Sequence, residues 1–344
     1  MEKWYEIPEK PDSNVIYSRV RLVRNWEDYP FPGKMTREQS LEMTARLFEE
    51  LKQMDIHDSV DYRFAFLHQM TELQRTALLE RRAINRSLAK KTEPSALILS
   101  RDESLGISIN GDDHVRIQAV EKGLNLSGCY DRADRMDEYI GGKIDYAFDE
   151  KYGYLTTFPT NVGTGLRASV VVHLPMLSRR RNFNSFVADM GRFGTSIRGV
   201  YGEGSENCGS LYRVSNQKTL GQSEKDIIDL VTKAAAELDA QERRLRKDAY
   251  KQHPVVCEDE TYKSYGVLKY ARKLTKKDSM EFLSQILTGV TDGILQLQEP
   301  CSIYALMLGI QTANLISKAE RPLNKEEVEV ARADFLRSRL PEIR

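Results

Sequence analysis

The order of segment types along the chain is the feature that most limits its fold. Before Ser223, short strand-like runs recur, and the clearest of them, residues 166–174 (LRASVVVHL), alternates between two faces. From Ser223 onward the pattern is helical, beginning with a long amphipathic helix that stops before Pro254. Short gaps between the strand-like runs favour antiparallel pairing. We therefore expect an α+β fold, with an antiparallel sheet flanked by helices and an all-helical domain after it.

The chain divides into two expected domains near His253-Pro254. Residues 1–253 hold the mixed domain, and residues 254–344 hold the helical one. Apolar stripes in the helical part, such as Ile286 with Leu287, fit an intramolecular core and also fit a dimer interface.

Composition and charge exclude several classes of protein. Lys and Arg number 51, as do Asp and Glu, so the chain is neutral overall and is not a nucleic-acid-coating protein. No apolar run approaches the roughly 20 residues that cross a bilayer, and the N-terminal segment lacks a signal-peptide core. The 4 cysteines and 5 histidines show no metal-binding spacing. We expect a cytoplasmic protein with reduced thiols, no resident metal site, and neither membrane nor nucleic acid as a partner.

The basic residues are biased towards arginine, with 30 Arg against 21 Lys. The arginines in strand-like segments or in adjoining loops are Arg19, Arg21, Arg116, Arg167 and Arg198. Taken singly, each segment also fits an ordinary turn, such as the Asn110-Gly111 hairpin signal, or a charged edge strand. The chain has no P-loop and no GxGxxG motif after a strand. Together, the five arginines predict a site where forked guanidinium groups hold the phosphates of a polyanion.

Four sequence blocks resemble those of a known family. They resemble, in order and spacing, the signature blocks of the phosphagen (guanidino) kinases. The four blocks are SRVRLVRN (18–25), NGDDHVRIQ (110–118), FPTNVGTGLRAS (158–169) and RGVYGEGSENCGSLYRVSNQKTLGQSEKDII (198–228). Creatine and arginine kinases carry a helical domain before the first block, whereas here a helical region follows the blocks. This arrangement resembles the bacterial protein-arginine kinases of the McsB type. The resemblance implies ATP-dependent transfer of the γ-phosphoryl group to arginine side chains of proteins, which marks them for regulated proteolysis or stress regulation.

The resemblance also implies the site residues. The five arginines align with the family's phosphate-binding arginines, and Asp112 and Glu203 align with its catalytic carboxylates. The other positions in its ATP-contacting segments are Tyr17, Ser18, Val20, Arg82, Ala168, Ser169, Val170, Val171, Gly199, Val200, Tyr201 and Gly202, with Glu203 in the same loop. ATP with Mg²⁺ is the implied cofactor. A guanidinium pKa lies above about 12, so its nitrogen attacks phosphorus only after a carboxylate has oriented it and accepted a proton.

The chain departs from the family pattern at several of these positions. The usual Asn-Glu-Glu-Asp run is Asn110-Gly111-Asp112-Asp113 here, so one acid is absent and the expected base is one methylene shorter. A misplacement of about 1 Å can lower the rate on the order of 10²-fold, and Asp113 is the alternative base. Phe158 replaces a cysteine, and Arg82 replaces a histidine. Near the C-terminus, the bacterial enzymes often carry an Arg-Asp-x-x-Arg-Ala motif that forms a phosphoarginine pocket. Only the second half of this motif, Arg332-Ala333, is present here.

Two other functions remain open from the sequence. Gly111 and Asp112 also fit a nucleotide-binding regulatory pseudokinase with weak or no activity. A small-molecule guanidino kinase is the second alternative, although the N-terminal domain that supplies the substrate loop in that branch has no counterpart before residue 18. The resemblance favours a homodimer through the C-terminal helices. It also implies an activator protein and a Clp ATPase as partners, besides protein substrates with exposed arginines.

Overall fold

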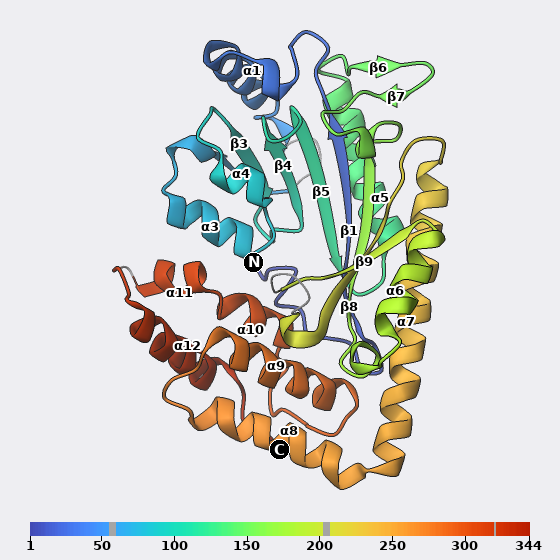
Figure 1. Ribbon diagram of the computed structural model, residues 1–344. Coiled ribbons are helices and arrows are strands. Elements are labelled where there is room, and N and C mark those ends of the chain that lie inside the picture. The colour runs from blue at the N-terminus through green and yellow to red at the C-terminus, as the bar shows by residue number, and fades with distance from the viewer. Residues whose placement is uncertain (55–59, 202–206, 320) are drawn as a thin grey trace.

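The computed structural model describes residues 1–54, 60–201, 207–319 and 321–344. Within these residues, eight strands form one antiparallel sheet, which confirms the expected α+β class. From edge to edge the strands are β2 (Tyr62–Phe66), β3 (Ala96–Ser100), β4 (Leu105–Ile109), β5 (Val115–Lys122), β1 (Val15–Arg24), β8 (Leu166–His173), β10 (Leu211–Asn216) and β9 (Thr195–Gly199). Strands β6 (Phe148–Asp149) and β7 (Gly153–Tyr154) form a separate hairpin. β1 comes first in sequence but lies inside the sheet (Figure 1).

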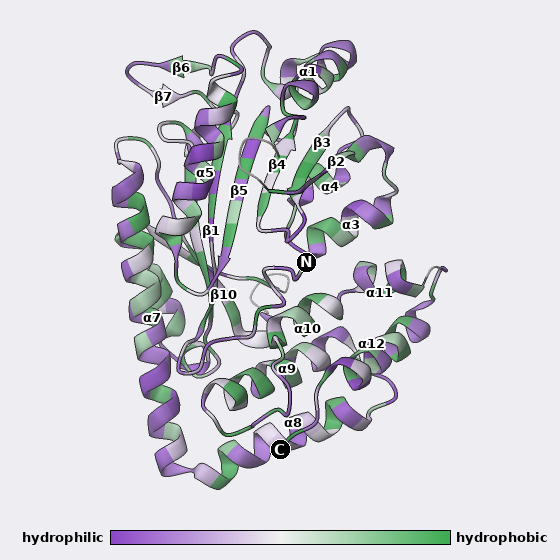
Figure 2. Cartoon of the chain, turned by 180° about the vertical axis from the view of Figure 1, so that it is seen from behind, coloured by the Kyte–Doolittle hydropathy of each residue, from purple (hydrophilic) through white to green (hydrophobic). Residues whose placement is uncertain are grey.

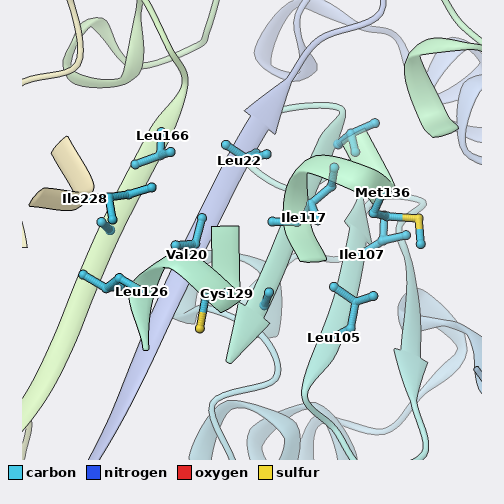
Figure 3. Packing of buried hydrophobic residues seen from close by; sticks show 14 of the residues in the cluster. Val20, Leu22, Leu105, Ile107, Ile117, Leu126, Cys129, Met136, Leu166 and Ile228 are labelled. Carbon is cyan, nitrogen blue, oxygen red and sulfur yellow. The ribbon is translucent and has the colours of Figure 1, made fainter. Parts of the chain in front are cut away.

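One face of the sheet is covered by helices. These are α1 (Arg37–Glu50), α5 (Leu126–Gly141) and α7 (Glu224–Gln252), with α6 (Phe183–Arg192) against β9. Because side chains alternate along a strand, Val20 and Leu22 of β1 point to this face. They pack there with Leu166 of β8, Met136 of α5 and Ile228 of α7 (Figure 3). Burial of this continuous apolar layer fixes the register of the strands.

The opposite face is covered at two places. Helices α3 (Glu72–Glu80) and α4 (Arg86–Lys90) pack on Leu97 and Leu99 of β3. The C-terminal helices pack against Tyr17, Val171 and Leu211. Figures 1 and 2 show these helices gathered below the sheet. They are α8 (Pro254–Tyr270), α9 (Lys276–Thr291), α10 (Ile303–Gly309), α11 (Thr312–Ala319) and α12 (Lys325–Arg339). Between the two covered parts, the central strands present polar side chains.

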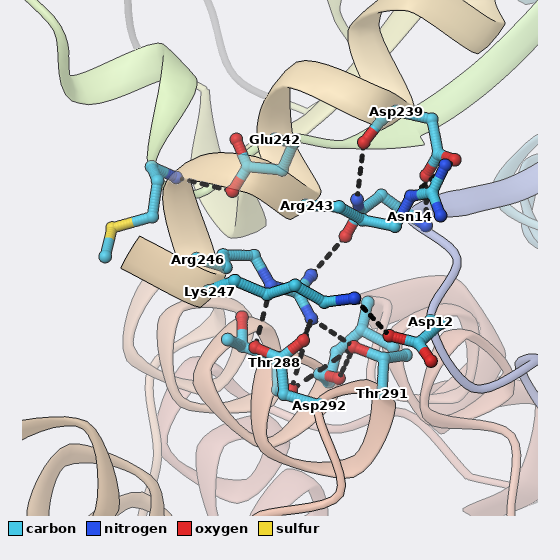
Figure 4. A network of polar contacts seen from close by, with 12 residues as sticks. Asp12, Asn14, Asp239, Glu242, Arg243, Arg246, Lys247, Thr288, Thr291 and Asp292 are labelled. Atoms are coloured by element: carbon cyan, nitrogen blue, oxygen red, sulfur yellow. Dashed lines mark hydrogen bonds and ion pairs between the residues drawn. The ribbon is translucent and has the colours of Figure 1, made fainter. Parts of the chain in front are cut away.

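A buried polar network joins α7 to the C-terminal helices (Figure 4). Arg246 of α7 donates from Nε to Asp292 Oδ2 at 2.9 Å and from Nη2 to Thr291 Oγ1 at 2.7 Å. It also donates to Asn14, whose backbone N–H donates to Asp239 at 2.7 Å. Arg246 therefore connects the segment before β1, the long helix and the end of α9 within one cluster.

Three helical stretches of the chain are interrupted in the structure. The 71–90 segment divides into α3 and α4, because Arg82 adopts a left-handed conformation with φ 69°. The 176–193 segment contains a short 3-10 turn and then α6, and the 301–317 segment divides into α10 and α11. Pro254 was expected to end a helix, and it also starts α8, where its missing N–H has no intrahelical partner to lose. Among the described residues, no helix combines the length and the apolar character needed to cross a membrane.

Candidate active site

Strand alternation brings the arginines of the central strands to one face of the sheet. Val20 and Leu22 point into the helix-covered core, so Arg19 and Arg21 point to the opposite face. Arg21 lies in register with Gln118 of β5 and with Arg167 of β8. Arg116 of β5 is in register with Val23 of β1, one step further along the same face.

The guanidinium groups of this arginine face form no ion pair with an acid among the described residues. Within the same residues, the Nε atoms of Arg19, Arg21 and Arg116 are buried without a hydrogen-bond partner. Burial, reinforced by neighbouring cations, lowers the pKa of Arg21 well below its ordinary value. Burial likewise lowers the pKa of Arg19 to about 10. Such a set of unpaired cations is costly in the free protein and is offset when a polyanion binds.

Three of the arginines share a cleft with acidic side chains. Arg21, Arg116 and Arg167 line a cavity of about 170 Å³ together with Asp112 and Asp113. The loop before β8 approaches this cavity through Gly165, whose φ is 64° and where a Cβ would lie 2.7 Å from the Val23 carbonyl oxygen. The cleft therefore places arginine side chains directly beside carboxylates.

Asp112 is held by two donors at the mouth of this cleft. Asn85 Nδ2 donates to Asp112 Oδ2 at 2.7 Å, and Ser87 Oγ donates to Oδ1 at 2.6 Å. Each carboxylate oxygen has two acceptor sites, so one on each oxygen stays available for a guanidinium. Asn110, two residues before Asp112, has a left-handed φ of 57° in the turn that leads to Asp112. The sequence suggested the base here, but it did not indicate the Asn85 and Ser87 contacts.

The neighbouring Asp113 links three segments of the chain. It is buried, and its Oδ1 accepts from Asn25 Nδ2 at 2.8 Å and from the Thr157 backbone N–H at 2.7 Å. These bonds join the β4–β5 loop to the end of β1 and to the segment before β8. Each carboxylate accepts two hydrogen bonds, and Asp112 is the more exposed of the two.

Four of the predicted nucleotide-site residues lie on the face of the sheet opposite the arginines. Ser18, Val20, Ala168 and Val170 point to the helix-covered face, where the Ser18 hydroxyl donates to the Gly123 carbonyl at 2.8 Å. Their side chains are therefore remote from the arginine face, because a contiguous sequence block on a strand alternates between two faces.

Others of the predicted set lie on the arginine face or beside it. Tyr17 and Val171 pack against the C-terminal helices, and Ser169 is buried next to Arg19. Arg198 and Gly199 end β9 in exposed positions, and Val200 follows them. Gly202 and Glu203 lie outside the described residues.

Arg82 extends this surface towards the C-terminal helices. Its guanidinium carbon lies 4.5 Å from the centre of the Tyr201 ring, which is a cation–π arrangement. Its backbone carbonyl accepts from Gln118 Nε2 at 2.9 Å, which ties it to β5.

Arg213 is a further member of the arginine face that sequence reasoning missed. It lies on β10 directly opposite Arg198 of β9 and beside Val171 of β8. Its Nε atom is also buried without a hydrogen-bond partner among the described residues. The alternation in LYRVSN, with Val214 in the core, is the signal that places Arg213 on this face.

An antiparallel sheet that presents a row of arginines beside carboxylates suits an enzyme that acts on phosphates. The family model of the ATP:guanido phosphotransferase C-terminal catalytic domain matches residues 42–245. The model described as the protein-arginine kinase McsB C-terminal domain matches residues 254–344. The chain belongs to the ATP:guanido phosphotransferase family.

Relatives and solved structures agree with this assignment. The protein-arginine kinase of Caldanaerobacter subterraneus subsp. tengcongensis is 37% identical over 326 residues, which is 95% of this chain and 96% of that protein. That of Halalkalibacterium halodurans is 38% identical over 331 residues, or 96% and 93%. The duplicated taurocyamine kinase from Schistosoma mansoni with bound transition state analog components has a TM-score of 0.59 at 26% identity, over 68% of this chain and 34% of that one. Lombricine kinase, at 24% identity and a TM-score of 0.59 over 68% of this chain and 67% of its own, supports the fold alone.

Proposed function

We propose that this protein is an ATP-dependent protein-arginine kinase, which transfers the γ-phosphoryl group to arginine side chains of other proteins. The observation that carries the proposal is the cleft in which Arg21, Arg116 and Arg167 meet Asp112. A surface of unpaired guanidinium groups suits a nucleotide polyphosphate, and an adjacent carboxylate suits a guanidinium substrate. The curated relatives that align over nearly the whole chain are named protein-arginine kinases.

The proposed nucleotide site is the arginine face. We assign the ATP phosphates to Arg19, Arg21, Arg116, Arg167 and Arg198, with Arg213 added. By the family resemblance, Arg82 and residues 199–203 complete the nucleotide side. ATP enters as its magnesium complex, and the ion supplies further neutralisation of the phosphates. Within the parts of the chain that the structure describes, no group of three or more His, Cys, Asp or Glu could hold a metal ion.

The proposed chemistry is an in-line phosphoryl transfer. Asp112, held by Asn85 and Ser87, contacts the flat guanidinium of the target arginine through its free acceptor sites, and Glu203 acts as the second carboxylate. A nitrogen–phosphorus bond forms as the bond from the γ-phosphorus to the β–γ bridging oxygen breaks. The proton lost by the nitrogen passes to a carboxylate, and ADP leaves. The arginine face stabilises the charge on the transferring group.

The organisation into parts is also a proposal. We assign residues 1–253 to catalysis and residues 254–344 to dimerisation and regulation, and we propose a homodimer. An activator protein and a Clp ATPase are proposed partners on the strength of the family resemblance. The ATP requirement and the free thiols of all 4 cysteines support a cytoplasmic location.

Detection of phosphoarginine tests the proposed function. The protein is incubated with Mg·ATP and an unrelated folded substrate protein, and acid-labile phosphoarginine is mapped by mass spectrometry. We expect modified arginines on the substrate and little turnover of free arginine. Turnover of free arginine alone would support the small-molecule kinase. Nucleotide binding without any phosphoarginine would support the pseudokinase.

A further inference from the structure

A second hollow meets the arginine-lined cleft at Asp112. It is a groove of about 1000 Å³ between the start of α1, the end of α4 and the segment before β8. Gly111, Asp112 and Phe158 line both the groove and the smaller cleft. The two hollows are therefore continuous at the carboxylate.

The position of the groove assigns it to the phosphate acceptor. The arginine face occupies the cleft side of Asp112, so the nucleotide approaches from there. The acceptor then reaches Asp112 from the groove side. A groove of about 1000 Å³ is large for a free amino acid and accommodates a segment of polypeptide.

Basic side chains dominate the charge of this groove. The cations that line it are Arg37, Lys90 and Lys91, and the acids are Glu93 and Asp112. Arg37 and Lys90 are exposed, and neither forms an ion pair within the described residues. Lys91 Nζ donates to the Gly111 carbonyl at 3.0 Å, which fixes its charge beside the Asp112 loop. When Asp112 is occupied by the target guanidinium, three cations face one remaining acid.

We propose that this groove docks the substrate protein and favours target arginines that have acidic residues beside them. The inference rests on the proposed kinase function and adds a substrate preference to it. Carboxylates near the target arginine pair with Arg37 and Lys90, whereas basic neighbours are repelled. Phe158, which is 48% exposed where the two hollows meet, provides an apolar wall for the methylene stem of the target arginine.

The preference is tested with peptides that each contain one arginine. Three peptides of equal length carry two Glu, two Gln or two Lys on each side of that arginine. Initial rates of phosphoarginine formation give kcat/KM for each peptide. Exposed ion pairs are individually weak, so we expect the Glu peptide to exceed the Gln peptide by about five- to tenfold, mainly through KM. The ratio should shrink at high salt.

A double variant connects the preference to the groove. In Arg37→Ala/Lys90→Ala, the ratio of kcat/KM for the Glu and Gln peptides should fall towards one. The matched control, Lys225→Ala/Lys233→Ala, removes two exposed cations from α7, which covers the other face of the sheet, and should keep the ratio. Equal rates for Glu and Gln peptides, or a preference that persists in the groove variant, would overturn the inference. Absence of phosphoarginine on every peptide and on folded proteins would instead refute the proposed function.

Discussion

Arg21 lies between Arg167 and Gln118 in the register of three strands, with an unpaired Nε atom and a pKa lowered by burial. A residue in such a position serves binding at the expense of stability, because the free protein must bury an uncompensated cation. The same reasoning applies to the other members of the arginine face. Stability and activity should therefore respond in opposite directions to its removal.

We predict that Arg21→Met raises the free energy of unfolding of the nucleotide-free protein by about 1 kcal/mol. The same change should lower kcat/KM on the order of 10²-fold or more, since a charge-stabilising donor is lost. Urea denaturation and phosphoarginine rates measure the two effects. Arg63→Met, an exposed arginine on edge strand β2, is the control and should change neither. A destabilised variant with normal activity would contradict this assignment.

His114 supplies a pH-dependent contribution at the base of the Asp112 loop. Its Nδ1 accepts from the Trp26 N–H at 3.0 Å, and Nε2 lies 3.0 Å from the Pro30 carbonyl oxygen. Burial lowers the pKa of His114 from 6.5 to about 4. The unfolded chain therefore binds more protons than the folded one between these two values. The contribution of neutral His114 to the free energy of unfolding should be fully present above pH 6.5 and should be lost as the pH falls towards 4.

We predict that His114 lowers the free energy of unfolding by up to about 3 kcal/mol near pH 4, compared with pH 7. Thermal unfolding between pH 7.5 and pH 5 measures the slope, and His114→Gln should reduce it. His253→Gln, at an exposed position, is the control. An identical slope in wild type and His114→Gln would contradict the prediction.

At the scale of elements, Glu80 connects α3 to α11. Its two carboxylate oxygens accept the backbone N–H groups of Ala313 at 3.0 Å and Asn314 at 2.8 Å. These are otherwise unpaired donors in the first turn of α11, so the carboxylate caps that helix from a distant part of the chain. Burial raises the pKa of Glu80, and the two backbone donors oppose that shift.

We predict that Glu80→Ala lowers the free energy of unfolding by about 1–2 kcal/mol, because two helix-terminal donors lose their acceptor. Hydrogen exchange should show faster exchange of the Ala313 and Asn314 amides. Glu72→Ala, at an exposed position of α3, is the matched change and should leave both amides protected. Unchanged protection of the Ala313 and Asn314 amides in Glu80→Ala would contradict the prediction, because the capping bonds would then not stabilise the start of α11.

Element types were predictable where local chemistry determines them. Thr36 with Gln39 and Thr71 with Gln74 have the sequence pattern of a capping box, and the structure has capping boxes with these residues at the starts of α1 and α3. The break between α3 and α4 was not predictable, because Arg82 takes a left-handed φ that its residue type disfavours. Its carbonyl bond to Gln118 of β5 supplies a tertiary contact that no local pattern contains.

At the scale of the whole molecule, Arg246 is a buried polar connection between the two proposed parts. It is paired with Asp292 and bonded to Asn14 and Thr291. Replacement of one partner of a buried pair leaves the other charge uncompensated. We predict that Arg246→Met lowers the free energy of unfolding by about 3–5 kcal/mol, measured by denaturant titration. Lys247→Met, an exposed neighbour, should change it little, and equal effects of the two variants would contradict the prediction.

The sequence predicted the sheet, the helical C-terminal region and most of the arginine face, because strand alternation and short blocks carry that information. It did not predict that the C-terminal helices cover Tyr17 and Val171 on the arginine side of the sheet. The residues assigned by resemblance to the family's ATP-contacting segments include both faces of each strand, and the structure places Val20 and Ala168 in the helix-covered core. Contacts between elements far apart in sequence decide both features.

In the proposed function, the arginines of one cleft bind the nucleotide, and Asp112 in the same cleft orients the arginine that is phosphorylated. The most direct measurement compares nucleotide binding by calorimetry with phosphoarginine formation by mass spectrometry in wild type, Arg21→Ala and Asp112→Ala. We predict that Arg21→Ala loses both binding and transfer, whereas Asp112→Ala still binds Mg·ATP and loses transfer. Full transfer activity in Asp112→Ala, or unaltered nucleotide binding in Arg21→Ala, would contradict this assignment.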